Sequence, residues 1–353
     1  MTQPPLERGA LILAGGRGER FWPWSTPTRP KQLLPLASGG RTLLAATFAR
    51  ATQLMPAANV VVMTSAALVE ACHRECPGAI VVGEPMGRNT APAIAAAAAF
   101  FAEGSTFAVL PSDHAIDDDA AFVADFERAF SVAAREPLLV TFGIKPTRPE
   151  TSFGYVKRGT LLANRLHRVA QFTEKPDLER AQDWVASGEY AWNSGMFVWG
   201  KRAFFAALAA GRPAVAAAFA GLNFRAGQER AFEAVLAARF PAVESVSVDY
   251  AVLEVAPNVV TLEAAFDWDD LGSWRAWARR QPHDARGNVT WGDAVPVDCD
   301  RCVVVGDGSP AASLGLSDMV VVVTPQGTLV CRLADSEQVR RVTEAVRARG
   351  SHA

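Results

Sequence analysis

Short apolar runs alternate with longer helical runs along the first two-thirds of the chain. Runs rich in Val, Ile and Leu predict buried strands at residues 10–14, 59–64, 79–83, 106–110 and 138–143. Runs rich in Ala and Leu predict helices at residues 42–54, 65–74, 90–102 and 120–135. This alternation is typical of an α/β fold, with a mostly parallel mixed sheet that carries helices on both faces.

The pattern changes after residue 143. We expect an inserted segment that forms one wall of a cleft, with strands at 153–157 and 168–173 and Ala-rich helices between 201 and 238. A further strand at 258–262 leads into an aromatic turn.

A second change falls near residue 284. Residues 288–333 are Val-rich with regular turn signals, and a charged terminal helix is expected at 335–349. The predicted domains are therefore 1–284, the larger one, and 285–353, a small β-rich domain with a terminal helix.

Composition excludes several classes of protein. The chain has 353 residues, 50% of them hydrophobic and 20% charged, which is typical of a globular protein. A net charge of -2 gives no overall positive charge to attract nucleic acid or an anionic membrane. Five cysteines favour a reducing compartment, and the longest apolar run, 91–102, is too short to cross a bilayer. We therefore expect a soluble, cytoplasmic protein.

The strongest chemical signal is a glycine-rich loop directly after the first predicted strand. Gly15, Gly16 and Gly18 let backbone N–H groups approach an anion, and Arg20 and Lys31 add positive charge. The loop lacks the third glycine of a dinucleotide fingerprint and the Gly-Lys-Ser/Thr of a P-loop. It predicts a phosphate-binding site of another kind, with a basic surface turn as the alternative.

Two separated aspartates suit a divalent cation. Asp113 follows the predicted strand 106–110, at the sheet edge where α/β proteins bind ligands, and Asp270 lies in an acidic, aromatic turn. Alone, Asp269 or Asp270 would be interpreted as a helix N-cap. Together with Asp113 and the phosphate loop, one of these two aspartates indicates a Mg²⁺ site completed by waters and substrate phosphates.

Further polar groups occur in the inserted segment and after the third strand. Glu174 and Asn193 suit sugar hydroxyls and Lys175 suits a phosphate, although an exposed ion pair and a turn remain the alternative. The block 84–92 follows a strand and opens a helix, so that Asn89 or Thr90 could cap the helix. The pairs Cys72/Cys76 and Cys299/Cys302 are interpreted as packing residues, and His114 as a structural neighbour of Asp113.

These motifs resemble a known family. The chain is similar to the sugar nucleotidyltransferases, and most of all to bacterial mannose-1-phosphate guanylyltransferases, over about residues 9–280. The matching blocks are the glycine loop with Pro30-Lys31-Gln32, then 84–92, 111–114, 153–155, 174–176, 193–197, 249–251 and 268–274. The block 84–92 points to the guanylyl branch.

The resemblance implies a Rossmann-like catalytic domain followed by a small domain of left-handed β-helix type that often mediates a homodimer. It implies that Gly15, Gly16 and Gly18 cradle the nucleotide, that Arg20 and Lys31 hold its phosphates, and that Asp113 and Asp270 bind Mg²⁺. The predicted nucleotide set also includes Glu84, Asn89, Thr90 and Ser112. The donors at N1 and N2 of guanine could be accepted by a carboxylate or by a main-chain carbonyl, and Glu84 is the nearest candidate in the block 84–92. Gly154, Glu174 and Asn193 would contact the sugar and Lys175 its phosphate.

The implied reaction is attack of mannose 1-phosphate on the α-phosphorus of GTP, giving GDP-mannose and pyrophosphate. The phosphomonoester is already anionic at neutral pH, so that alignment and charge neutralisation suffice without a general base. The alternatives are another sugar 1-phosphate, such as a manno-heptose phosphate or glucose 1-phosphate, another base, such as thymine, or a non-catalytic paralogue that binds GDP-sugar. The expected partners are the two substrates, with no nucleic acid and no membrane.

The chain departs from the family pattern at two positions. Glu19 stands where many relatives have Thr, and Val255 stands where many have Lys. The second departure removes a possible phosphate contact. No cupin extension follows the β-rich region, so that the isomerase activity of bifunctional relatives is not expected.

Overall fold

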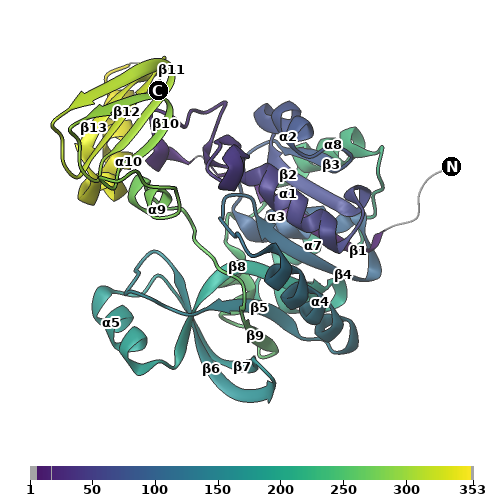
Figure 1. The fold of residues 1–353 in the computed structure, drawn as a ribbon. Coiled ribbons are helices and arrows are strands. Elements are labelled where there is room, and N and C mark those ends of the chain that lie inside the picture. Colours follow the sequence, from purple (N-terminus) through teal and green to yellow (C-terminus); the bar gives the residue numbers. More distant parts are fainter. Residues whose placement is uncertain (1–5, 17, 351–353) are drawn as a thin grey trace. The chain divides into compact units, whose positions relative to one another are not determined.

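The computed structural model describes residues 6–16 and 18–350 (Figure 1). The chain divides into two compact units. Unit 1 contains the residues up to 15, 47–112 and 116–268, and unit 2 contains 16–46, 113–115 and the residues from 269 onward. Unit 2 therefore takes in more than the predicted β-rich domain, and the domain boundary near residue 284 stays a prediction.

Unit 1 contains a nine-stranded sheet of order β3-β2-β1-β4-β8-β5-β9-β7-β6. Its strands are β1 (Leu6–Ala14), β2 (Val60–Ser65), β3 (Ile80–Glu84), β4 (Phe101–Pro111), β5 (Leu139–Ile144), β6 (Gly154–Ala163), β7 (Leu166–Glu174), β8 (Tyr190–Gly200) and β9 (Val259–Glu263).

The sheet is mixed and mostly parallel, as predicted. Strands β3, β2, β1 and β4 run parallel, as do β5 and β9. Strand β8 lies antiparallel between β4 and β5, and the hairpin β6–β7 extends the other edge. The sequence prediction missed β8, because its tryptophans and small residues resemble a turn followed by a short apolar run.

The helices of unit 1 flank this sheet (Figure 1). They are α2 (Val69–Glu75), α3 (Thr90–Ala97), α4 (Asp119–Arg135), α5 (Leu178–Ser187), α6 (Lys201–Gly211), α7 (Pro213–Phe219) and α8 (Glu229–Arg239). The first residues of helix α1 (Leu43–Leu54), up to residue 46, belong to unit 2, and the rest belong to unit 1. Within the described residues, no helix combines the length and apolar character needed to cross a membrane.

The predicted helix 90–102 is too long at its end. Helix α3 stops at Ala97, a short 3-10 turn follows, and β4 begins at Phe101. The reason is aromatic packing, since Phe101 is buried and stacks on Phe107 with ring centroids 5.1 Å apart. This tertiary contact overrides the helical preference of the alanine run.

Unit 2 contains a four-stranded sheet of order β10-β11-β12-β13. Strands β10 (Val289–Val297), β11 (Val303–Leu314) and β12 (Met319–Thr324) are parallel neighbours in chain order, and β13 (Gly327–Arg332) pairs antiparallel. A C-terminal β-rich region was predicted, and the structure confirms it. Helices α9 (Trp274–Ala278) and α10 (Val339–Ala348) complete the unit.

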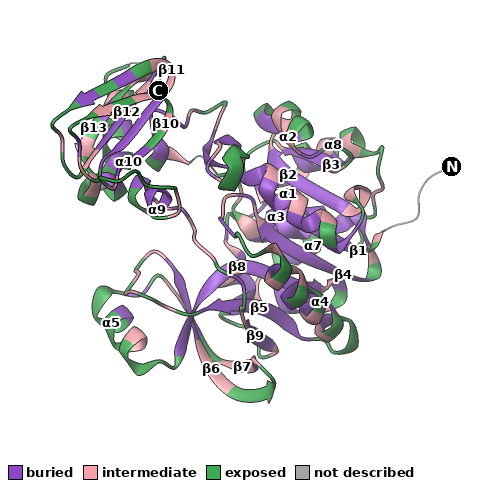
Figure 2. Ribbon diagram, viewed as in Figure 1, coloured by how far each residue is buried: buried purple, intermediate pink, exposed green. Residues whose placement is uncertain are grey.

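The core of unit 2 joins residues that are distant in the chain. Trp24 is buried and stacks on Trp274 with ring centroids 5.7 Å apart, and Phe21 lies 5.0 Å from the same ring. Valines of β10, β11 and β12 pack into the same cluster. Figure 2 shows buried positions along these strands and along the strands of the large sheet. The residues just after the glycine loop are therefore fixed by a rigid aromatic core.

Candidate functional site

The glycine loop approaches Lys31 closely inside unit 2. Gly18 has a left-handed conformation with φ of 61°, and a Cβ atom there would overlap Cβ and N of Lys31. Gln32 donates from Nε2 to the carbonyl of Gly16 at 3.1 Å. Only glycine combines the left-handed conformation with the lack of a Cβ atom that position 18 requires. The loop and the segment carrying Lys31 therefore form one structural element.

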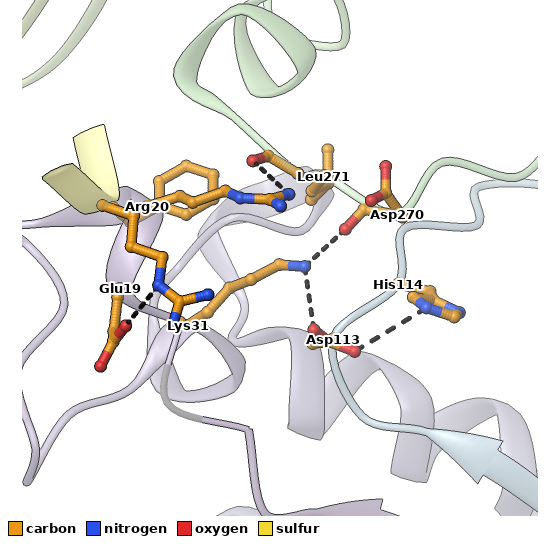
Figure 3. Close-up of a pocket in the computed structure, with 11 residues that line it drawn as sticks. Glu19, Arg20, Lys31, Asp113, His114, Asp270 and Leu271 are labelled. Atoms are coloured by element: carbon orange, nitrogen blue, oxygen red, sulfur yellow. Dashed lines mark hydrogen bonds and ion pairs between the residues drawn. The ribbon is translucent and has the colours of Figure 1, made fainter. Parts of the chain in front are cut away.

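Lys31 is the centre of a polar network (Figure 3). Its side chain is buried, with 9% of its surface exposed. Its ammonium group donates to Oδ2 of Asp113 at 2.9 Å and to the backbone carbonyl of Asp270 at 2.5 Å. One cation therefore joins the Lys31 segment to both predicted metal-binding aspartates.

A cavity of about 420 Å³ opens beside this network. Arg20 is exposed at its wall and donates to the carbonyl of Gly272 at 3.4 Å. The cavity is lined by Gly18, Glu19, Arg20, Phe21, Lys31, Asp113, His114, Asp270, Leu271, Gly272 and Arg340. We call it the phosphate pocket, because it gathers the cations that the glycine loop was predicted to supply.

The charge of Asp113 is set by its neighbours. Burial would raise the pKa of Asp113, but the Lys31 ammonium and the nearby His114 imidazole hold it below its usual value. Nε2 of His114 lies 3.8 Å from Oδ1 of Asp113. Asp113 is therefore an ionised oxygen donor at neutral pH.

The neighbouring aspartates at 269 and 270 have different surroundings. Asp269 accepts from the amide of Leu271 at 2.8 Å and forms an ion pair with Arg279 at 3.3 Å. Asp270 lines the phosphate pocket, and the N-cap of α9 is Ser273. The N-cap interpretation of Asp269 or Asp270 is therefore wrong, because the helix begins later than that interpretation requires.

Asp113 and Asp270 fit a Mg²⁺ ion that keeps waters and substrate oxygens as its other ligands. Mg²⁺ prefers hard oxygen donors and is commonly held by one or two carboxylates next to a bound phosphate. Across residues 6–16 and 18–350, no group of three or more His, Cys, Asp or Glu side chains could enclose a metal ion. The two aspartates line one pocket and offer oxygen donors of the kind that Mg²⁺ takes.

The block 84–92, in unit 1, is held by residues near 240–248. Arg88 donates to the carbonyls of Phe240 and Pro241 at 2.7 and 2.8 Å. Thr90 accepts from the amide of Val248 at 2.8 Å. Asn89 caps α3 by accepting from the amide of Thr90, so the N-cap interpretation is confirmed.

Glu84 sits at the end of β3 beside the first glycine of the loop. A Cβ atom at Gly15 would lie 3.9 Å from Oε2 of Glu84. Its Oε1 is buried without a hydrogen-bond partner in the described structure, and burial raises the pKa of Glu84 to about 7. A buried acceptor without a partner is costly unless a ligand satisfies it, which makes Glu84 a candidate ligand-binding group.

The predicted sugar-binding residues converge in unit 1. A Cβ atom at Gly154 would lie 2.5 Å from Oε2 of Glu174 and 3.4 Å from Cβ of Asn193. Lys175 is exposed, and its ammonium lies 3.3 Å from Oε1 of Glu174. The structure therefore brings Gly154, Glu174, Lys175 and Asn193 together.

Asp249 is a member of this group to which the sequence assigned no role. It accepts from Nδ2 of Asn193 at 3.0 Å, and Oδ1 of Asn193 accepts from Thr141 at 2.8 Å. Burial raises the pKa of Asp249. The pKa of Glu174 is raised to about 7, mainly by burial and to a smaller extent by repulsion from Asp249. The motif 249–251 was the only signal in the sequence that pointed to it.

The remaining predicted positions are placed as follows. Ser112 is buried, and its amide donates to the carbonyl of Leu13 at 3.1 Å. Gly16 is exposed, and among the described residues no heavy atom lies within 4 Å of an added Cβ. Val255 is 51% exposed and offers no charge to a phosphate.

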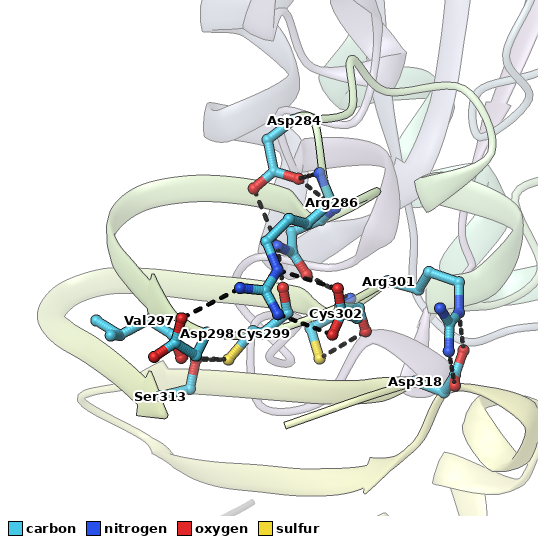
Figure 4. A network of polar contacts seen from close by, with 11 residues as sticks. Asp284, Arg286, Val297, Asp298, Cys299, Arg301, Cys302, Ser313 and Asp318 are labelled. Carbon is cyan, nitrogen blue, oxygen red and sulfur yellow. Dashed lines mark hydrogen bonds and ion pairs between the residues drawn. The ribbon is translucent and has the colours of Figure 1, made fainter. Parts of the chain in front are cut away.

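Cys299 and Cys302 lie in the turn between the parallel strands β10 and β11 of unit 2 (Figure 4). Both side chains are buried, and Asn288 bridges the carbonyl of Cys299 and the amide of Cys302. Two residues of this turn also form paired hydrogen bonds: Asp300 accepts from Arg286, and Arg301 donates to Asp318. The packing role expected for these cysteines agrees with this position.

Comparison with known proteins gives consistent matches. The family model described as nucleotidyl transferase matches residues 9–287, and the one described as MannoseP isomerase/GMP-like beta-helix domain matches 292–346. A mannose-1-phosphate guanylyltransferase of Klebsiella pneumoniae is 37% identical over 95% of this chain and 73% of its own length. The xanthan biosynthesis protein XanB of Xanthomonas campestris is 38% identical over 96% of this chain and 73% of its own length.

Solved structures show the same fold. One described as a mannose-1-phosphate geranyltransferase from Thermus thermophilus superposes with a TM-score of 0.84 at 34% identity, covering 97% of this chain and all of that chain. One described as a mannose-6-phosphate isomerase from Helicobacter pylori gives a TM-score of 0.60 at 25% identity, covering 75% of this chain and all of that chain.

The raised pKa of Glu174 predicts a pH-dependent stability. Its folded-state pKa of about 7 lies above the usual value of 4.5, so its contribution to stability is present below about pH 4.5 and is lost as pH rises through 7. Glu174→Gln should remove this loss. In denaturant titrations, the difference in free energy of unfolding between the Glu174→Gln variant and the unmodified protein should shift in favour of the variant by on the order of 2 kcal/mol from pH 4.5 to pH 8.

Glu179→Gln, at an exposed position in the first turn of α5, is the matched control and should leave the pH profile unchanged. If the stability of Glu174→Gln and of the unmodified protein depends on pH in the same way, ionisation of Glu174 does not destabilise the folded state.

Proposed function

This chain belongs to the nucleotidyl transferase family and is an enzyme of that class, and on that premise we propose that it transfers a guanylyl group from GTP to α-D-mannose 1-phosphate. The products would be GDP-mannose and pyrophosphate. The observation that carries the choice of substrates is that mannose-1-phosphate guanylyltransferases of Klebsiella pneumoniae and Escherichia coli align with 95% of the chain at 36–37% identity.

The proposed chemistry is a single displacement at phosphorus. A phosphate oxygen of mannose 1-phosphate forms a bond to the α-phosphorus of GTP, and the bond from that phosphorus to the bridging oxygen of the β-phosphate breaks. The departing electron pair leaves with pyrophosphate. The nucleophile is already an anion at neutral pH, so no side chain has to remove a proton.

Charge neutralisation is then the main task of the protein. Arg20 and Lys31 in the phosphate pocket would bind the triphosphate and offset the charge that develops on pyrophosphate. Lys31 is buried and fixed by Asp113 and by the Asp270 carbonyl, so it needs no rearrangement when the substrate binds. A fixed cation of this kind stabilises a transition state more than a mobile one does.

Asp113 and Asp270 would hold Mg²⁺. When bound, the ion would supply positive charge next to the α-phosphate and draw the two anionic substrates together. The low pKa of Asp113 supports this role, because a metal ligand must be ionised.

Glu84 would recognise the guanine base. Guanine offers N–H donors at N1 and N2, and Oε1 of Glu84 is a buried acceptor without a partner among the described residues. A site built to accept these bonds would discriminate against a base that lacks the donors, because the acceptor would then stay unsatisfied.

Gly154, Glu174 and Asn193 would bind the sugar. Their carboxylate and amide groups suit hydroxyl groups, and a side chain at position 154 would overlap the Glu174 carboxylate. Lys175 is exposed next to Glu174 and would bind the phosphate of the sugar. The homodimer and the cytoplasmic location expected from the sequence stay predictions.

The test is pyrophosphate release by the purified chain with Mg²⁺, across GTP, dTTP, UTP and ATP, each with mannose 1-phosphate and glucose 1-phosphate. We expect release mainly with GTP and mannose 1-phosphate, and its loss when excess chelator removes Mg²⁺. Mass spectrometry of the products should show GDP-mannose.

Each other outcome changes the proposal in a defined way. Release with a different pair would retain the reaction type and replace the substrates. No release from a folded chain that binds GDP-mannose would contradict catalysis and favour the non-catalytic alternative.

The metal assignment predicts the effect of Asp270→Asn. Loss of this carboxylate should lower the rate by on the order of 10²-fold and raise the Mg²⁺ concentration needed for half-maximal rate. The neighbouring Asp269→Asn is the matched control, because Asp269 contacts Leu271 and Arg279 within the turn, and its rate should stay within about threefold. Near-normal turnover of Asp270→Asn at limiting Mg²⁺ would show that Asp270 does not bind the metal.

A further inference from the structure

The C-terminal helix packs against the turn that carries Arg20, inside unit 2. Nη1 of Arg347 lies 2.7 Å from Oε1 of Glu19, and Nε of Arg340 lies 3.5 Å from Oε2 of the same carboxylate. Between them, the hydroxyl of Thr343 donates to the carbonyl of Glu19 at 3.3 Å. The spacing of these three residues places them on one face of α10, so that face is fixed on the turn.

This contact accounts for a carboxylate in the phosphate-binding turn. Glu19 stands between Gly18 and Arg20 in the phosphate-binding turn, where a free carboxylate would repel a phosphate. Its side chain is only 15% exposed, and among the described residues it pairs at 2.7 Å with Arg347, which does not line the phosphate pocket. The negative charge is therefore compensated by Arg347 outside the pocket and by Arg340 at its wall.

Arg340 does line the pocket, together with Arg20 and Lys31. Its Nε donates to Glu344 at 3.1 Å, while its two terminal nitrogens have no hydrogen-bond partner among residues 6–16 and 18–350. The ammonium of Lys31, by contrast, is already engaged by Asp113 and Asp270. Two of the three donors of the Lys31 ammonium are therefore already used, whereas both terminal nitrogens of Arg340 remain available to a ligand in the pocket.

We propose that Arg340 is a third phosphate-binding cation of the nucleotide site, positioned by Glu19, so that the C-terminal helix is part of the site. A guanidinium group with two free terminal nitrogens suits bidentate binding of a phosphate. This inference rests on the proposed function, in that the pocket receives the polyphosphate end of the nucleotide. Glu19 acts as a positioning residue, because its carboxylate lies 3.5 Å from Nε of Arg340.

The test uses inorganic pyrophosphate with Mg²⁺ as the probe and isothermal titration of the full chain. Arg340→Gln should weaken pyrophosphate binding by about tenfold, the effect of losing one charge-assisted hydrogen bond at an exposed site. Arg341→Gln is the matched control. It removes the same charge from the same helix, but Arg341 bonds Gln338 and lies outside the phosphate pocket, so affinity should stay within about twofold.

Two further variants separate binding from positioning. Arg340→Lys should recover part of the affinity, because it restores the charge without the bidentate geometry. Glu19→Gln removes a carboxylate from the pocket as well as the contact that positions Arg340, so it is measured together with Arg340→Gln. The affinity lost on Arg340→Gln should be smaller in the Glu19→Gln background than in the unmodified protein. Circular dichroism of each variant checks that the chain is folded.

Equal affinities for Arg340→Gln and Arg341→Gln, or no binding of Mg²⁺-pyrophosphate by the unmodified chain, would overturn the inference. The probe contains neither guanine nor sugar, so the inference fails or stands independently of the proposed substrates. If guanylyl transfer is also observed, Arg340→Gln should raise the KM for GTP and leave that for mannose 1-phosphate unchanged.

Discussion

The buried ammonium of Lys31 holds the phosphate pocket together. It binds the carboxylate of Asp113 and the backbone carbonyl of Asp270, and it lies against a glycine that has no room for a side chain. A buried cation is stable only when its donors are satisfied, so the two acceptors fix the position of Lys31 as much as Lys31 fixes theirs. The aromatic core around Trp24 and Trp274 also contains Phe21, which directly follows the Arg20 turn.

This arrangement suits a reaction that needs alignment more than proton transfer. Arg20, Lys31 and Arg340 present positive charge around one pocket, while Asp113 and Asp270 provide oxygen donors for a cation. The residues proposed to bind the base and the sugar lie in unit 1, in groups that contain the buried carboxyls of Glu84, Glu174 and Asp249. Hydrogen-bond acceptors of this kind match the donors of a guanine base and of sugar hydroxyls.

The sequence predicted the parts of this picture that depend on local pattern. Glycines after a buried strand and Asp113 after another were both recognisable from short motifs. The bond from Lys31 to Asp113 and Asp270 was not, because it joins three distant segments and no periodicity records such a contact. Helix 90–102 was extended too far because alanine propensity does not report the stacking of Phe101 on Phe107. Arg340 gave no signal, since a charged terminal helix is also typical of a solvated surface.

The most direct test of this account is a double-mutant cycle between Lys31→Met and Asp113→Asn, measured as the free energy of unfolding of each single variant, the double variant and the unmodified protein. If the Lys31 ammonium holds the Asp113 segment in place, the two changes should be coupled by at least about 1 kcal/mol. Additive effects, with coupling near zero, would show that the pocket is organised without this bond and would contradict the account.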